Sequence, residues 1–195
     1  MNRELMNSPE EKALYDKFCE KNYIPIFSKP WWLDAVCGKD NWGVHVLEKS
    51  GQFLGAMPYY VENRNGYEII TKAHHSQNNG ILISYLPNMK YVAMLDRQEE
   101  VINEMCDYIE KLNVDKYEQQ YHYSFTNCLP FKWRGYEAMV RYTYVIDDTS
   151  DMDKICADFK YIVRNQIKKA EKVVTVKEGM NIEKFYEINK LSYDR

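Results

Sequence analysis

The stretch that decides the fold is residues 43–71, GVHVLEKSGQFLGAMPYYVENRNGYEIIT. Apolar and polar residues alternate from Gly43 to Glu48, and strand-like runs follow from Phe53 to Val61 and from Tyr67 to Thr71, a pattern typical of half-buried strands. Ser50-Gly51 and Asn65-Gly66 separate the three runs, and Asn-Gly favours the tight turn of a β-hairpin. The sequence therefore predicts a three-stranded antiparallel meander over residues 42–71.

Two helices are expected before this meander. The motif Ser8-Pro9-Glu10-Glu11 has a capping serine, a proline at the first helical position and a glutamate three residues after the serine, which predicts a helix to about Asn22. Ser28 and Pro30 repeat this pattern, and Gly38 is a suitable residue to end the second, shorter helix.

Further elements are expected after the meander. The apolar run from Ile81 to Leu86 stops at a proline. A helix is then expected to begin at Asp96 or Arg97, because apolar residues recur at helical spacing. These are Val101, Ile102, Met105, Ile109 and Leu112. Tyr121–Phe125 and Glu137–Ile146 are expected to form more strands, and we expect the meander to pack on the helix near Ser8 or on this later one.

A long basic helix is expected near the end of the chain, with Ser150 as its cap. Its cations Lys160, Arg164, Lys168 and Lys172 recur every four residues and form one stripe. A neighbouring apolar stripe consists of Ile155, Phe159, Val163, Ile167 and Ala170. The charge is local, because the whole chain has a formal net charge of -3. A strand over Val173–Lys177 and a helix over Ile182–Tyr193 are expected to follow.

The composition is typical of a globular protein that remains in the cytoplasm. The chain has 195 residues, of which 45% are hydrophobic and 28% are charged. No apolar run approaches the roughly 18 residues that a membrane-spanning helix needs, and the N-terminal residues lack the apolar core of a signal peptide. The five cysteines are widely spaced and form no Cys-x-x-Cys pair, which argues against disulfides and against a zinc site. No metal site is expected.

Two segments carry a resemblance to a known family. Residues 159–172, FKYIVRNQIKKAEK, followed by the strand-like residues 173–176, resemble the helix and strand near the start of the second domain in the FemAB-like branch of the GNAT superfamily, the acyl-CoA N-acyltransferases. Residues 25–36, PIFSKPWWLDAV, resemble the aromatic-rich helix near the N-terminus of the same proteins. The two segments occur in the order that this family would have.

The resemblance implies an α+β fold, with a mixed, largely antiparallel sheet flanked by helices, as in acyl-CoA N-acyltransferases. Residues 1–140 would form a first acyltransferase-like domain, and residues 141–195 would begin a second one that we expect to be incomplete here. The implied activity is acyl or aminoacyl transfer to an amine. The alternative is a non-catalytic binding or interaction module with the same fold.

Five residues are candidates for substrate binding: Lys160, Arg164, Lys168, Trp32 and His75. The three cations can make charge-assisted hydrogen bonds to phosphate, or they can simply be a solvated helix face. Trp32 can line an acyl cleft or stack on a base, or it can pack its helix on the sheet. His75 can act as a general base or be a loop residue, and the sequence identifies no catalytic residue.

The acyl donor is expected to bind outside this chain. A pyrophosphate-binding loop of the pattern Gln/Arg-x-x-Gly-x-Gly/Ala does not occur in the sequence, and Gln77-Asn78-Asn79-Gly80 is too short to replace it. The resemblance implies acyl-CoA or aminoacyl-tRNA as the donor of the full-length protein, and therefore tRNA as a partner beside a small amine or anionic substrate. The chain departs from the cell-wall enzymes of the family at Val36-Cys37, where a lysine would be expected.

Overall fold

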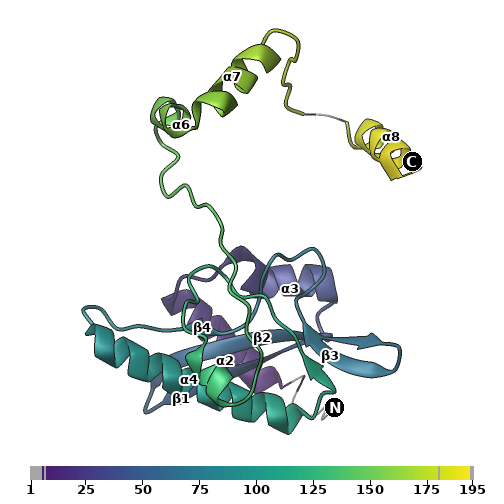
Figure 1. The fold of residues 1–195 in the computed structure, drawn as a ribbon. Coiled ribbons are helices and arrows are strands. Elements are labelled where there is room, and N and C mark those ends of the chain that lie inside the picture. Colours follow the sequence, from purple (N-terminus) through teal and green to yellow (C-terminus); the bar gives the residue numbers. More distant parts are fainter. Residues whose placement is uncertain (1–5, 7, 180, 194–195) are drawn as a thin grey trace. The chain divides into compact units, whose positions relative to one another are not determined.

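The computed structural model describes residues 6, 8–179 and 181–193, and the chain divides into two compact units, Met1–Thr143 and Tyr144–Arg195. The first unit contains the sheet and the helices that cover it (Figure 1). The second contains α6 (Met152–Asp158), α7 (Tyr161–Ala170) and α8 (Ile182–Tyr193). None of the described helices is long and apolar enough to cross a membrane.

The predicted meander forms the centre of the first unit. Strands β1 (Trp42–Lys49), β2 (Gln52–Arg64) and β3 (Tyr67–Thr71) pair antiparallel in chain order. Asn65 and Gly66 at the second turn have φ values of 56° and 87°, which is the left-handed geometry of a two-residue hairpin turn. The prediction of a three-stranded meander from the sequence is confirmed.

Two short strands extend the sheet. Strand β4 (Leu82–Ile83) pairs antiparallel with β2 at Gly55 and Ala56, and β5 (Lys116–Tyr117) pairs parallel with β3. At Gly55, a Cβ atom would lie only 2.5 Å from Val101 Cγ1 and 2.8 Å from the Leu82 carbonyl oxygen. Glycine is therefore needed there, because β2 touches both its neighbouring strand and a helix.

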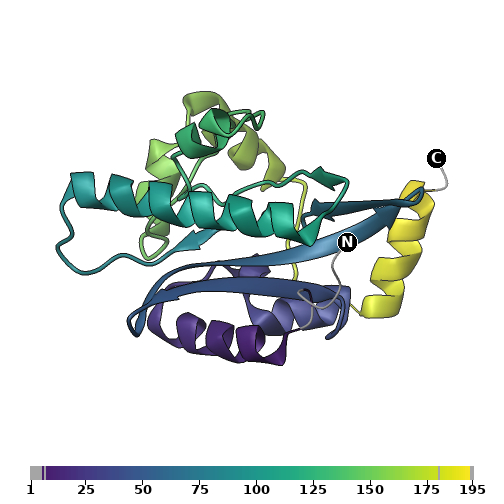
Figure 2. The ribbon, with the colours of Figure 1, turned by 90° about the horizontal axis from the view of Figure 1, so that it is seen from below.

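Helices cover both faces of this sheet. Figure 2 shows α2 (Pro9–Lys21) and α3 (Pro30–Cys37) on one side and α4 (Tyr91–Leu112) on the other. One hydrophobic cluster joins α2 and α3 to the sheet through Tyr15, Phe18, Leu33, Val44 and Val46. The other joins α4 and the short α5 (Leu129–Trp133) to it through residues that include Met57, Ile70, Ile102, Met105 and Phe131. The mixed α/β architecture with a largely antiparallel sheet is the fold class that we expected.

The start of α2 differs from the expected capping box in one detail. Ser8 Oγ accepts a hydrogen bond from the Glu11 backbone N–H at 3.2 Å, as predicted. The Glu11 carboxylate instead accepts the Val46 backbone N–H at 2.8 Å and lies 3.1 Å from His45 Nδ1. Because β1 is an edge strand of the described sheet, Glu11 covers an N–H group that has no strand partner.

Helix α4 begins at Tyr91, which corrects the expected start at Asp96 or Arg97. Its N-cap, Lys90, makes no side-chain capping bond, so no sequence signal marks the first turn. The apolar stripe begins later because the first turns of the helix are largely exposed, whereas Val101 to Leu112 contribute the buried residues. The sequence pattern therefore located the packed part of the helix and missed its exposed beginning.

The strand predicted at Tyr121–Phe125 is wrong. This segment turns, with the Phe125 backbone N–H donating to the His122 carbonyl at 2.9 Å. Tyr121 stacks on Phe125 with 4.3 Å between ring centroids and also packs on Phe131. The aromatic residues pack against α5 and α4, and this packing replaces the cross-strand pairing that their spacing suggested.

The strands predicted at Glu137–Ile146 and Val173–Lys177 are also absent, and both segments are exposed. Neither segment pairs with a strand of the described sheet. The N–H groups of Val173 and Val174 both donate to the Ala170 carbonyl. A run of β-branched residues is therefore not enough when no sheet edge is available to it.

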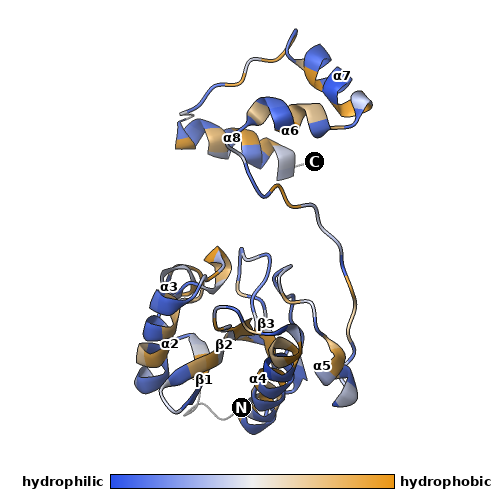
Figure 3. Ribbon diagram, turned by 90° about the vertical axis from the view of Figure 1, so that its left-hand side faces the viewer, coloured by the Kyte–Doolittle hydropathy of each residue, from blue (hydrophilic) through white to orange (hydrophobic). Residues whose placement is uncertain are grey.

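The long basic helix is interrupted. Helix α6 is capped by Asp151 and not by Ser150, and it ends at Asp158. Phe159 and Lys160 have extended backbones before α7 begins at Tyr161. None of the described residues in α6, α7 or α8 is buried, although each helix carries both hydrophobic and hydrophilic residues (Figure 3). Because these residues are not buried, no packing energy favours one continuous helix, and short isolated helices are only marginally stable in water.

Candidate functional site

Trp32 and His75, two of the candidates from the sequence, lie in the first unit. Trp32 is half-buried, and its indole N–H donates to Ser76 Oγ at 2.9 Å. Its ring lies edge-on to Phe27 and to Trp31, at centroid distances of 5.2 and 5.9 Å. His75 is exposed and has a φ of 56° in the turn that holds Ser76. Trp32, on α3, therefore contacts the loop that carries His75, but the two side chains are not joined by a hydrogen bond.

Asn79 anchors this loop. Its side-chain oxygen accepts the Ala73 backbone N–H at 3.0 Å, and its side-chain nitrogen donates to the Phe27 carbonyl at 2.7 Å. The side chain is 5% exposed, so the two backbone groups that it satisfies are shielded from water. Asn79 therefore fixes the segment between β3 and β4 to the single 3-10 turn Ile26–Ser28, which precedes α3.

The cationic candidates Lys160, Arg164 and Lys168 lie in the second unit, and all three are exposed. Lys160 is the N-cap of α7 and has an extended backbone, so the predicted regular ladder of cations begins only at Arg164. Arg164 and Lys168 remain one helical turn apart on α7. The sequence candidates therefore belong to two different units of the chain.

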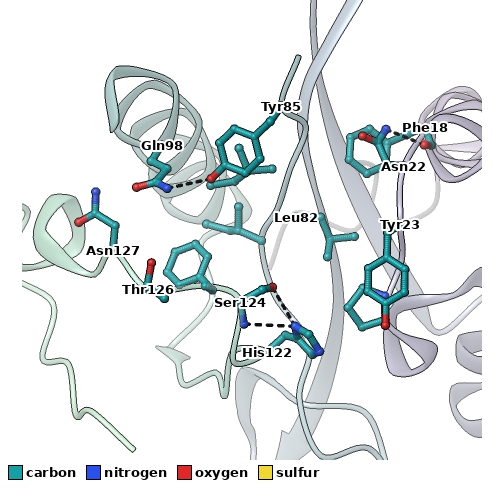
Figure 4. Close-up of a pocket in the computed structure, with 14 residues that line it drawn as sticks. Phe18, Asn22, Tyr23, Leu82, Tyr85, Gln98, His122, Ser124, Thr126 and Asn127 are labelled. Carbon is teal, nitrogen blue, oxygen red and sulfur yellow. Dashed lines mark hydrogen bonds between the residues drawn. The ribbon is translucent and has the colours of Figure 1, made fainter. Parts of the chain in front are cut away.

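A pocket that the sequence did not predict lies in the first unit (Figure 4). It has a volume of about 110 Å³ and is lined by the end of α2, strand β4, one side chain of α4 and the segment 122–127. We call it the relay pocket. Its polar lining residues include Asn22, Tyr85, Gln98, His122 and Ser124.

His122 and Ser124 form a hydrogen-bonded pair in the relay pocket. The Ser124 backbone N–H donates to His122 Nδ1 at 3.3 Å, and Ser124 Oγ lies 2.8 Å from the same nitrogen. A backbone N–H can only donate, so Nδ1 is unprotonated and the serine hydroxyl also donates to it. Partial burial lowers the pKa of His122, because desolvation disfavours the charged ring. The neutral imidazole therefore carries its proton on Nε2.

The opposite side of the relay pocket offers an unused acceptor. Gln98 donates through Nε2 to the Tyr85 hydroxyl at 2.8 Å, whereas its Oε1 is buried and has no hydrogen-bond partner among the described residues. A buried carbonyl oxygen without a partner is costly. A ligand that brings an N–H or O–H group to Gln98 would remove this cost.

Three of the cysteine thiols are held in their neutral form. Burial raises the pKa of the thiols of Cys19, Cys37 and Cys106 to about 11, so that they stay protonated near neutral pH. Within residues 6, 8–179 and 181–193, no group of three or more His, Cys, Asp or Glu side chains is placed to hold a metal ion. Hydroxyl and imidazole chemistry is what the relay pocket can offer.

The sequence contained one signal for this site, the spacing His122-x-Ser124. We expected Tyr121–Phe125 to be a strand, in which residues two apart such as His122 and Ser124 share one face. The sequence did not indicate which element would pack on that face. A turn is what allows the serine to bond back to the imidazole. The pocket itself joins segments more than one hundred residues apart, from Phe18 to Asn127, which periodicity cannot reveal.

No family model and no curated protein sequence matches this chain. Among solved structures, the ribosomal-protein-alanine N-acetyltransferase of Brucella melitensis biovar Abortus is similar over 70% of this chain and 88% of its own, with 13% identity and a TM-score of 0.35. An aminoglycoside acetyltransferase from an uncultured soil metagenomic sample, in complex with sisomicin, is similar over 71% and 87%, with 12% identity and a TM-score of 0.35. A second aminoglycoside acetyltransferase from such a sample reaches 72% and 95%, with 12% identity and a TM-score of 0.38. At such values the likeness carries no conclusion about activity.

Proposed function

We propose that the chain takes part in N-acyl transfer to an amine, and that the incoming amine binds in the relay pocket. The observation that carries this proposal is the pair of Ser124 and His122, in which Nδ1 of a neutral imidazole accepts a hydrogen bond from the serine hydroxyl. Acyl transfer to an amine requires removal of a proton from nitrogen, which a neutral imidazole can accept. The resemblance of residues 25–36 and 159–176 to FemAB-like proteins supports the same class of reaction.

Ser124 would relay the proton. As the amine nitrogen bonds to the acyl carbon, one of its protons passes to Ser124 Oγ, and the serine proton passes to His122 Nδ1. The imidazole then carries protons on both nitrogens and can return one to the leaving group of the donor. The bond between the acyl carbon and that leaving group breaks, and the pair returns to its starting state.

Gln98 would orient the amine. Its partnerless Oε1 can accept a hydrogen bond from one amine N–H while the proton of the other passes to Ser124, and this hydrogen bond would orient the nitrogen lone pair. This arrangement also explains why a polar group is tolerated in a buried position. The acyl donor need not fit in the relay pocket, whose volume of about 110 Å³ suits a small amine-bearing group.

The donor and the remaining candidate residues belong to the same proposal. We propose acyl-CoA or aminoacyl-tRNA as the donor of the full-length protein, with Lys160, Arg164 and Lys168 as contacts for its anionic part. Trp32 and His75 would support the acceptor side in the first unit. Residues 1–140 would then be one acyltransferase-like domain of the FemAB type, residues 141–195 the beginning of a second, and the cytoplasm the place of action.

The test uses a small activated ester, so that no donor site is needed. The purified chain is mixed with p-nitrophenyl acetate and hexylamine, and the formation of N-hexylacetamide is followed by mass spectrometry. Replacing the base of such a relay lowers the rate by about a hundredfold or more. We expect this loss for His122→Gln and a similar one for Ser124→Ala.

The matched control is His74→Gln, because His74 is exposed and lies outside the relay pocket. It should keep the rate of the unmodified chain, and circular dichroism should show that all three variants are folded. If His122→Gln and His74→Gln acetylate hexylamine equally well, the relay plays no part and the proposal is wrong.

A second candidate is a non-catalytic interaction module with an acyltransferase-like fold. The observation that favours it is the exposure of apolar residues on α7 and α8, where Ile162, Phe185 and Leu191 are 63%, 56% and 67% exposed. Such residues usually pack against something. Retained binding of a partner by a chain that shows no His122-dependent acyl transfer would favour this alternative.

A further inference from the structure

The pair of Ser124 and His122 has the parts of an activated nucleophile as well as those of a proton relay. Ser124 Oγ donates to His122 Nδ1 at 2.8 Å, and the Ser124 backbone N–H donates to the same nitrogen at 3.3 Å (Figure 4). A serine becomes a good nucleophile when a neighbouring base takes its proton and a third group holds that base in place. Ser124 therefore supplies both the nucleophile and the backbone donor that orients the base.

The hydroxyl of Ser124 is open to a ligand. Ser124 is exposed, and within the part of the chain that the structure describes its Oγ has no hydrogen-bond partner other than His122. A hydroxyl that donates one hydrogen bond keeps its oxygen lone pairs for a carbonyl carbon. Partial burial lowers the pKa of His122, so the imidazole stays neutral and able to accept the serine proton.

Apolar side chains beside the pair can hold an acyl chain. Phe18, Ile81, Leu82 and Phe125 line the relay pocket, whose volume is about 110 Å³. Moving a hydrocarbon chain from water onto such a surface is favourable in proportion to the area that it buries. A pocket of this size suits a short acyl chain, whose carbonyl carbon can then lie beside Ser124.

We propose that this chain hydrolyses short-chain carboxylic esters, with Ser124 as the nucleophile that carries the acyl group and His122 as its base. This activity goes beyond the proposed amine acylation, because it needs no amine and no residue of the second unit. In amine acylation Ser124 passes on a proton, whereas in ester hydrolysis it forms a covalent bond to the acyl carbon.

The reaction has two steps that balance. As Ser124 Oγ bonds to the acyl carbon, its proton passes to His122 Nδ1, the bond from the acyl carbon to the leaving oxygen breaks, and the imidazolium returns the proton to that oxygen. A water then bonds to the acyl carbon and gives one proton to Nδ1. The bond from the acyl carbon to Oγ breaks, and Nδ1 returns the proton to Ser124. One ester and one water become one carboxylic acid and one alcohol.

The experiment mixes the purified chain with p-nitrophenyl acetate or p-nitrophenyl butyrate in the absence of any amine. Release of p-nitrophenol is followed by stopped flow, and acid-quenched samples are digested and mapped by mass spectrometry. We expect a burst of about one p-nitrophenol per chain, followed by slower turnover, with the acyl group on Ser124. The butyrate should react about tenfold faster in kcat/KM than the acetate, because the pocket buries two more CH2 groups.

Two variants and a matched control test the assignment. Ser124→Ala should abolish the burst and the covalent adduct, and His122→Gln should slow the burst by about a hundredfold or more. Ser192→Ala removes an exposed hydroxyl outside the relay pocket and should keep the burst. Circular dichroism of all three variants checks that they are folded.

An acyl group that maps to His122, or one that persists in Ser124→Ala, would overturn the proposal, as would equal kcat/KM for the two esters. Formation of N-hexylacetamide that depends on His122, without an acyl group on Ser124, would overturn ester hydrolysis and leave the proposed amine acylation standing. The reverse result, an acyl-Ser124 that is hydrolysed while no amide forms, would support ester hydrolysis and refute the amine acylation.

Discussion

At the scale of single residues, His122 combines three properties of a general base. It lines a pocket, its Nδ1 is unprotonated because a backbone N–H donates to it, and burial lowers its pKa. Neither His74 nor His75, which the sequence made more conspicuous, lines this pocket.

The lowered pKa of His122 predicts how activity and stability depend on pH. The imidazole should titrate below its ordinary value of 6.5, and the acetylation rate should rise with pH through the lowered pKa and then level off. The folded state disfavours the protonated ring, so as the pH falls below 6.5 the unfolded chain gains protons first and stability is lost until the folded-state pKa is passed. Nuclear magnetic resonance of the His122 ring and urea unfolding at several pH values measure the two effects.

The variant His122→Gln provides the comparison, because it should lose the contribution of this one group to the pH dependence of unfolding. A titration of His122 at or above the ordinary histidine pKa would contradict both the neutral ring and its assigned role. The control His74→Gln should leave the titration of His122 unchanged.

Asn79 gives a second prediction at this scale. Replacement by alanine leaves the Ala73 N–H and the Phe27 carbonyl without their shielded partners, which should lower the free energy of unfolding by about 1–3 kcal/mol. Urea unfolding followed by fluorescence measures the change. Asn103→Ala on α4 is the control, since it should change stability by less than about 0.5 kcal/mol, and equal effects of the two substitutions would refute the role of Asn79.

At the scale of elements, the sequence predicted what depends on local pattern and partner faces. The meander, α2, α3, α8 and the packed part of α4 followed from alternation, capping residues and helical spacing. Tyr121–Phe125 and Val173–Lys177 were wrong because strand-like composition cannot show whether a sheet edge is within reach. The relay pocket was missed because it depends on the tertiary placement of β4 against the segment 122–127.

Helix α7 carries the prediction about anion binding. Arg164 and Lys168 lie one turn apart, so they can contact neighbouring phosphates. Arg164→Ala should weaken binding of a nucleotide-linked or RNA ligand by about 1–3 kcal/mol. Folding should stay nearly unchanged, because Arg164 is exposed. Fluorescence anisotropy with labelled tRNA and a thermal unfolding curve are measured on the same samples.

The control for Arg164 is Lys177→Ala, an exposed cation outside α7. If both substitutions weaken binding equally, the effect is one of overall charge and not of the helix. Unfolding of the Arg164→Ala variant with unchanged affinity would make the arginine a structural residue instead.

At the scale of the whole molecule, the buried core and the relay pocket belong to the first unit, whereas the cationic helix belongs to the second. Under the proposed function, the residues that bind the amine and those that bind the anionic donor would therefore lie in different parts of the sequence.

The absence of a pyrophosphate loop pattern from the sequence leads to a prediction for the intact chain. It should neither bind acetyl-coenzyme A tightly nor use it to acetylate amines, and isothermal calorimetry measures the binding. A dissociation constant in the low micromolar range, about -8 kcal/mol, would instead place a complete donor site within these 195 residues. Hexylamine acetylation from p-nitrophenyl acetate serves as the positive control for a working acceptor site.

The contact between Glu11 and Val46 bears on whether a second chain can pair with the edge of the sheet. Strand β1 is eight residues long and lies at the edge of the described sheet, so its outward N–H groups can template the addition of a foreign strand. The Glu11 carboxylate accepts a hydrogen bond from the Val46 N–H, in the middle of β1. A strand that paired there would have to displace this charged group. The glutamate that the capping box would have used within its own helix therefore hinders strand addition at β1. Its loss would leave the Val46 N–H free to pair with a strand of a second chain.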